Sequence, residues 1–287
     1  AYCIRLPHPD WTPSGAPKLK VKPAKVAIVG ANVSANNAIR TPQFWCLWVI
    51  LFCNITAGIG ILENAAPMVQ DYYPALTAAA AAGFVGLLSL ANMGGRFIWS
   101  SASDVIGRKN IYMVYLGVGL IFYFVVASAG HTSLALFVVS TLILLTFYGG
   151  GFSTIPAYLR DLFGVYQVGA IHGRLLTAWS AAGVAGPLII NMVVERQASR
   201  GNSGPELYQL SLYIMCVLLA VGLVANILVK PVHKKWFEDP ETVQAKVEAD
   251  RASARASATT ATASGAGSLH ALAAVVLALA IAVLLVY

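Results

Sequence analysis

The stretch LANMGGRFIWSSASDVIGRK at residues 90–109 joins an apolar run of helical length to a compact charged turn. One cation, Arg96, interrupts the apolar run. The charged turn contains the residues Asp104, Gly107, Arg108 and Lys109. At about 1.5 Å per helical residue, Arg96 lies about 12 Å from the turn, near the middle of an apolar layer about 30 Å thick. An arginine at this depth requires a polar cavity or an anionic partner, because hydrocarbon solvates its charge poorly.

The composition of the whole chain excludes an ordinary water-soluble domain. Hydrophobic residues make up 58% of the sequence and charged residues only 11%, whereas soluble domains contain about 25% charged residues. Stretches of about 20 apolar residues, long enough to cross a bilayer, occur at residues 43–66, 75–100, 110–130, 134–158, 168–194 and 207–230. We therefore predict an all-α membrane protein with a six-helix transmembrane bundle over residues 43–230.

Positive residues divide the polar segments into two alternating sets. One set contains most of the Lys and Arg residues, and the other contains only Arg196 and Arg200. Because cytoplasmic loops carry the excess of Lys and Arg, we expect the first set, and with it both ends of the six-helix bundle, on the cytoplasmic side. The same rule accounts for the net charge of +7. We therefore expect the lipid bilayer as a partner and no nucleic acid.

The segments outside the bundle differ from it in composition. Residues 1–42 are polar, basic and proline-rich, without the apolar core of a cleavable signal peptide, and are expected to be a cytoplasmic linker. Residues 231–268 end in a low-complexity Ala, Ser and Thr stretch and are expected to be a flexible cytoplasmic tail. Residues 269–287 are apolar except for His270, and form either a seventh transmembrane or tail-anchor helix or an Ala-rich helix lying on other helices.

The turn at residues 104–109 resembles the D-x-x-G-R-K loop of the major facilitator superfamily. In that family the loop joins the second and third helices of each six-helix half, and its aspartate pairs with an arginine and a helix end to latch the halves together. The resemblance implies that Asp104, Gly107, Arg108 and Lys109 belong to a conformational latch. Ser100 departs from the pattern, because the family usually has glycine there. An ordinary solvated turn is the alternative.

Polar side chains inside the spans are the other candidates for substrate binding. Tyr148, Asn54 and Thr56 can form hydrogen bonds either in a cavity or with a neighbouring helix. The guanidinium fork of Arg96 matches a carboxylate. Its alternatives are snorkelling to the interface and pairing with a carboxylate in another part of the protein. Glu63 is expected near the opposite face, so it is not the predicted partner of Arg96.

Glycine and proline residues interrupt the fourth and fifth spans. They are Gly149, Gly150, Gly151 and Pro156 in the fourth, and Gly183, Gly186 and Pro187 in the fifth. Transporter helices use such interruptions to bend around a site at the membrane midplane. Small residues also allow close helix packing, so both interpretations remain open.

Several stretches resemble the oxalate/formate antiporter family. In chain order they are RTPQFW (40–45), NITAG (54–58), APM (66–68), GGR (94–96), PAYLRDLFG (156–164) and GAIHGRLLTAW (169–179). The likeness extends from about Ile4 to Lys230, and its first residues look like the cytoplasmic connection that follows the sixth helix of that family. The resemblance implies the C-terminal six-helix half of a twelve-helix transporter, with the N-terminal six-helix half missing.

The resemblance also implies a substrate class. In the oxalate-specific members of that family, one basic residue on the eighth helix and one lysine on the eleventh hold the two carboxylates. Arg96 matches the first, whereas Trp179 falls on or beside the second, so this lysine is absent. Trp179 lies about 10 Å from the cytoplasmic end of its helix, at a depth close to that of Arg96. A monocarboxylate such as formate or pyruvate fits one cation better than oxalate, whose second carboxylate would lack a partner.

We therefore expect secondary active transport of small carboxylates by alternating access, with no enzymatic step and no cofactor. The carboxylates and histidines scatter along the chain without a catalytic grouping, and the cysteines lack the paired spacing of a zinc or redox site. A transporter-derived receptor or assembly partner without transport activity is the alternative function.

Overall fold

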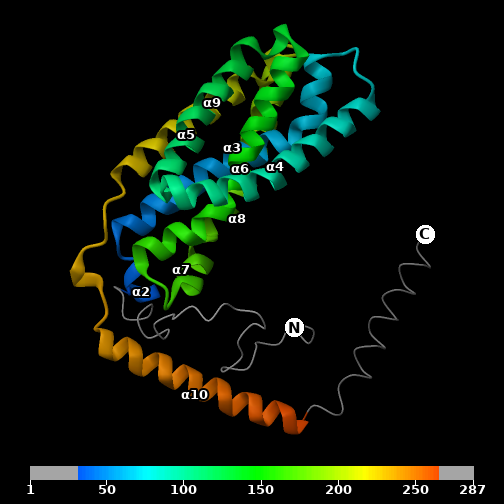
Figure 1. Cartoon of the computed structure of the whole chain (residues 1–287). Coiled ribbons are helices and arrows are strands. Elements are labelled where there is room, and N and C mark those ends of the chain that lie inside the picture. Colours follow the sequence, from blue (N-terminus) through cyan, green and yellow to red (C-terminus); the bar gives the residue numbers. More distant parts are fainter. Residues whose placement is uncertain (1–31, 265–287) are drawn as a thin grey trace. The chain divides into compact units, whose positions relative to one another are not determined.

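The computed structural model describes residues 32–264 of the chain (Figure 1). The expected linker, apart from its last residues, and the apolar run at residues 269–287 lie outside the described residues. The chain divides into two compact units, and Ala31–Glu238 form the unit that contains the helix bundle. Helix α10 (Pro240–Ser264) belongs to the other unit.

Residues 32–264 are almost entirely helical. The elements of the bundle unit are α2 (Ala35–Ala38), α3 (Pro42–Tyr72), α4 (Ala78–Ile106), α5 (Arg108–Ala129), η1 (Gly130–Thr132), α6 (Leu134–Phe163), α7 (Val168–Leu175), α8 (Thr177–Ala198), α9 (Glu206–Leu228) and η2 (Lys234–Trp236). Six helices are long and apolar enough to cross a membrane when α7 and α8 count as one. The prediction of a six-helix bundle is confirmed.

The helices are longer than the apolar stretches that predict them. Helix α3 continues to Tyr72 and α4 continues to Ile106, six residues beyond each expected limit. Hydropathy marks the part of a helix that matches the hydrocarbon layer, while the helix itself continues into the headgroup region. The true ends follow capping signals instead.

Local sequence signals account for several of these ends. The Thr41 hydroxyl accepts a hydrogen bond from the Phe44 N–H at 3.3 Å, and Pro42 occupies the first turn of α3. Thr77 caps the start of α4 in the same way. Gly107 separates α4 from α5 with a φ of +92°, a backbone conformation that favours glycine.

Helix α3 is the most buried helix of the bundle. The apolar core of α3 is 67% buried, against 22% for both α4 and the α7–α8 pair. It packs against α8 and α9 and also contacts α4 and α6. Helices α4 and α8 consequently expose large apolar side chains such as Phe97 and Leu188. These two faces require lipid or another apolar surface against them.

Glycines allow α4 and α6 to approach closely. A Cβ atom on Gly95 would lie 2.2 Å from a backbone oxygen of α6, and one on Gly149 would lie 2.0 Å from the backbone oxygen of Asn92. Helix α6 remains continuous through its glycine run and Pro156. Close packing therefore explains these glycines. The fifth span is interrupted instead at Leu176, between α7 and α8.

The segment expected to be a flexible tail, residues 231–268, contains α10. This segment is rich in alanine and also contains Glu, Lys and Arg, all of which favour helix formation. Low sequence complexity argues against a packed core, and it does not prevent a single helix with a polar surface. Helix propensity is the signal that predicts this element.

Candidate functional site

Arg96 lies on α4, ten residues before its last residue Ile106, and about 15 Å from that end. The side chain is half-buried, and its guanidinium carbon lies 4.9 Å from the centre of the Phe152 ring on α6. The Trp99 indole donates a hydrogen bond to the Thr146 hydroxyl at 3.1 Å and so fixes this part of α4 against α6. Within residues 32–264, the Arg96 guanidinium has no ion pair. Its charge is available to a ligand.

Trp179 completes an aromatic wall beside this arginine. It lies on α8, three residues after the interruption at Leu176, and its ring meets that of Phe152 edge-on at 4.5 Å between centroids. The Tyr148 ring lies 6.0 Å from the same indole. Three helices, α4, α6 and α8, therefore bring Arg96, Tyr148 and Trp179 together around Phe152.

Phe152 joins the predicted residues and was not among them. It follows Tyr148 by four residues on α6, which is the spacing of side chains on one helix face. That spacing is the signal that could have identified it, because any residue one turn from a candidate shares its surroundings. A cation over an aromatic face gains additional electrostatic stabilisation where water is scarce.

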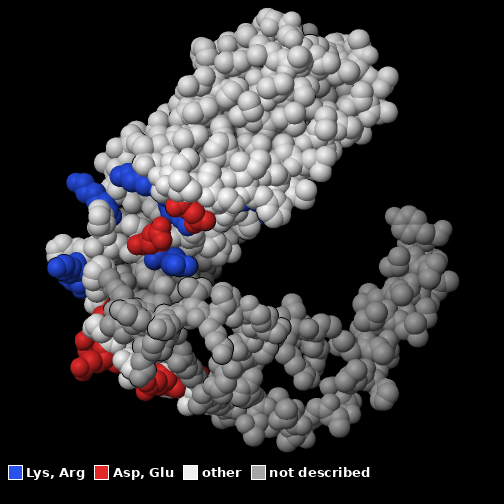
Figure 2. Space-filling view, in the orientation of Figure 1, with Lys and Arg blue, Asp and Glu red and all other residues white. Residues whose placement is uncertain are grey.

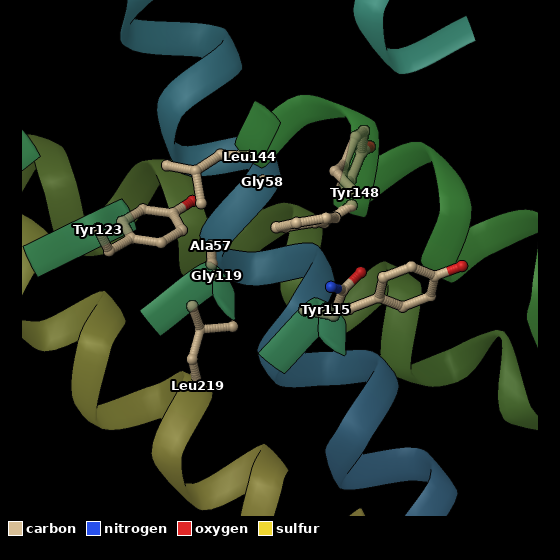
Figure 3. A pocket seen from close by; sticks show the side chains of 10 residues that line it. Ala57, Gly58, Tyr115, Gly119, Tyr123, Leu144, Tyr148 and Leu219 are labelled. Carbon is tan, nitrogen blue, oxygen red and sulfur yellow. The ribbon is translucent and has the colours of Figure 1, made fainter. Parts of the chain in front are cut away.

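Tyr148 and Asn54 also line a small internal cavity, which Figure 3 shows with Tyr148 close to Gly58 of α3. The Asn54 side chain is buried, and its carbonyl oxygen has no hydrogen-bond partner within the described part of the chain. The cavity leaves about 10 Å³ for the centre of a water molecule, the lower limit for one bound water. It is too small for a carboxylate, so the structure separates Asn54 from the open side of the Arg96 cluster.

The charged turn between α4 and α5 centres on Arg108. Its guanidinium forms an ion pair and hydrogen bond with Asp104, donates to the Ser103 hydroxyl, and lies 3.7 Å from the Asp161 carboxylate at the end of α6. Sequence reasoning missed Asp161, although it belongs to the PAYLRDLFG stretch. The loop therefore connects α4 and α5 to α6 by charge.

Lys109 has a different role from Arg108 in the same turn. Its ammonium group donates hydrogen bonds to the backbone oxygens of Ile227 at 2.9 Å and Val229 at 2.7 Å, at the end of α9. The Asn226 amide returns a hydrogen bond to the Lys109 carbonyl at 2.9 Å. A cation at a helix C-terminus satisfies its free carbonyls and complements its dipole. Lys109 thus ties α5 to α9.

Six apolar helices with charged turns at their ends define an integral, multi-pass membrane protein. Comparison with known families agrees, because the sequence model of the Major Facilitator Superfamily matches residues 2–187 and 95–287. The chain belongs to the Major Facilitator Superfamily, and its six helices form a six-helix half of that fold.

Two curated relatives carry transporter names. The chain is 26% identical over 189 residues to the oxalate:formate antiporter of Oxalobacter formigenes, covering 65% of this chain and 42% of that protein. It is 24% identical over 158 residues to the uncharacterized MFS-type transporter YhjX of Escherichia coli (strain K12), covering 55% and 39%. The resemblance to oxalate/formate antiporters is supported, and the names agree with the expectation of a transporter rather than an enzyme. The chain matches about two-fifths of the length of each relative.

Proposed function

We propose that this chain forms one half of a secondary transporter that carries small carboxylates, with a monocarboxylate favoured over oxalate. The observation that supports this proposal most is the Arg96 guanidinium, which is half-buried near midplane depth and has no ion pair within residues 32–264. A charge held there without a counter-ion is costly in an empty site. A carboxylate that binds bidentately to the guanidinium offsets that cost.

The preference for a monocarboxylate rests on Trp179. This residue stands on or beside the position of the second cation in the oxalate-specific pattern, and it packs on Phe152 at the edge of the site. An indole offers a second carboxylate no charge, so a dianion would lose hydration at one end without compensation. The relative's name contains both a dianion and a monoanion, and the chemistry of this wall favours the monoanion.

Alternating access requires a second lobe and a latch. The apolar faces of α4 and of the α7–α8 pair, each only 22% buried, supply a surface for an N-terminal half. The Asp104–Arg108–Asp161 cluster is a set of charges that can break and re-form when helices tilt. In this proposal both ends of the six-helix bundle lie in the cytoplasm, the side that the Lys and Arg distribution indicates.

The test is uptake of radiolabelled formate into liposomes that contain the complete protein. Arg96→Gln removes the charge and the fork, and we expect uptake to fall by about 100-fold, corresponding to the loss of strong charge-assisted hydrogen bonds. Arg196→Gln is the matched control, because Arg196 is exposed near the far end of α8 and has no ion pair within the described residues.

Undiminished uptake by the Arg96→Gln protein would refute the role of Arg96. No uptake by the unmodified complete protein, for formate, pyruvate or oxalate, would favour a receptor or assembly partner over a transporter. Competition between unlabelled oxalate and labelled formate tests the substrate preference separately. Oxalate competing better than formate would contradict the monocarboxylate proposal and leave the transport proposal intact.

A further inference from the structure

A basic segment directly follows α9 and takes no part in the Arg96 site. Residues 230–236 read KPVHKKW, and Lys230, Lys234 and Lys235 are exposed. None of these three ammonium groups forms an ion pair within residues 32–264. Figure 2 shows Lys and Arg side chains gathered at one end of the bundle, beside a few acidic ones. The segment therefore presents positive charge that the described residues do not neutralise.

The segment begins where the lipid-facing surface of α9 ends. Exposed apolar side chains recur every three or four residues along this helix, at Val217, Val221, Val224 and Leu228. Such a stripe on the outside of a membrane bundle contacts hydrocarbon. Lys230 follows two residues after the last of these side chains, at the level where lipid headgroups replace acyl chains.

The backbone of the segment is fixed at three points. Lys109 holds the end of α9 through two backbone carbonyls, as described above. The Gln43 side chain donates to the Pro231 carbonyl at 3.2 Å, and Phe237 pairs with Val33 in an isolated antiparallel bridge. The lysines therefore project from an ordered support, which lowers the entropy cost of binding.

An aromatic group accompanies the charges. Trp236 is half-buried, and the Lys235 ammonium lies 5.2 Å from the centre of its ring. Indoles are favoured at membrane interfaces, where an apolar ring meets a polar layer. Lysine ammonium groups bind phosphate as compact point charges with three donors.

We propose that residues 230–236 bind the headgroup of an anionic phospholipid. Lys230, Lys234 and Lys235 donate to the phosphate, Trp236 marks the level of the interface, and the acyl chains lie along the apolar stripe of α9. A lipid is the occupant, rather than a free anion, because the charges continue a hydrocarbon-facing surface. The affinity depends on salt, since exposed charges are screened within about 8 Å at physiological ionic strength.

The experiment is native mass spectrometry of the complete protein in detergent, titrated with phosphatidylglycerol or with phosphatidylcholine of the same acyl chains. We expect phosphatidylglycerol to bind more tightly. K234Q/K235Q should weaken its binding by about 30-fold, or about fivefold per lysine. K234R/K235R should retain it, which shows that charge, rather than a folding defect, is responsible.

R196Q/R200Q is the matched control, because it also removes two exposed positive charges and these lie on the other set of polar segments. We expect it to leave phosphatidylglycerol binding within about twofold, since exposed charges beyond a Debye length are largely screened. Equal losses in both double variants would show that net charge alone sets lipid binding, and would overturn the proposal. Equal binding of the two lipids, or full displacement by inorganic phosphate, would overturn it as well.

Discussion

The two parts of residues 90–109 treat their cations differently. Arg96, in the apolar part, packs on an aromatic ring and has no ion pair within the described residues. Arg108 and Lys109, in the turn, meet carboxylates and helix-end carbonyls. The turn contributes to the fold through these contacts, whereas the middle of the helix keeps a charge unneutralised at some cost in stability. An unpaired cation in a protected place indicates binding, and paired cations at a helix end indicate connection.

The largest effect is expected where the apolar part packs on α6. Gly95→Ala should lower stability by about 3 kcal/mol, because the new Cβ would lie 2.2 Å from a backbone oxygen and the helices must separate. Gly94→Ala is the control from the adjacent position, where a Cβ meets no atom within 4 Å. Thermal unfolding in detergent measures both. Similar midpoints for the two variants would show that the α4–α6 contact does not hold Arg96 in position.

Trp179→Lys tests the aromatic wall beside the unpaired cation. A second cation at this position should raise oxalate uptake relative to formate by at least about tenfold, the size of one charge-assisted hydrogen bond. The measurement is the ratio of labelled oxalate to labelled formate taken up by liposomes. Trp179→Phe keeps an aromatic side chain and should keep the original ratio. If the lysine and phenylalanine variants give the same ratio, Trp179 does not set the preference.

Arg108→Gln tests the paired cation of the turn. The Asp104 and Asp161 side chains are 67% and 57% exposed, so their loss of a shared partner should cost only about 1 kcal/mol. We expect a lower unfolding midpoint and slower transport at low salt, and a smaller difference from the unmodified protein at high salt. Arg160→Gln, which removes an exposed charge beside Asp161, is the control. A salt-independent defect would contradict an electrostatic latch.

Lys109→Gln should have the smallest effect. Removing the ammonium leaves two carbonyls at the end of α9 without their donor and should cost about 0.5 kcal/mol. Hydrogen exchange should increase in the last turn of α9 and remain unchanged in its first turn. Lys109→Arg should restore protection, because arginine also donates to carbonyls. Faster exchange along the entire helix would mean that Lys109 supports the bundle rather than one helix end.

The sequence predicted the helices better than their surroundings. Apolar length identified all six spans, because hydrocarbon requires each span to be apolar whatever its neighbours are. Arg96 and the turn were recognised from local pattern as well. The partners Phe152 and Asp161 were missed, since both lie on α6, far from Arg96 and Arg108 in sequence. Asn54 shows the converse, because a polar residue in an apolar span pointed to binding, and it lines an internal cavity.

The sequence by itself determined the class of this protein. Composition and run length required a membrane bundle, and the motif at residues 104–109 pointed to the superfamily before any contact was known. Tertiary structure decided which cations are paired. Helix periodicity gives the face of a side chain but not which helix packs on that face, so only the arrangement of α4, α6 and α8 shows Arg96 on Phe152 and Trp179. The charge available for a ligand is therefore a property of the packing.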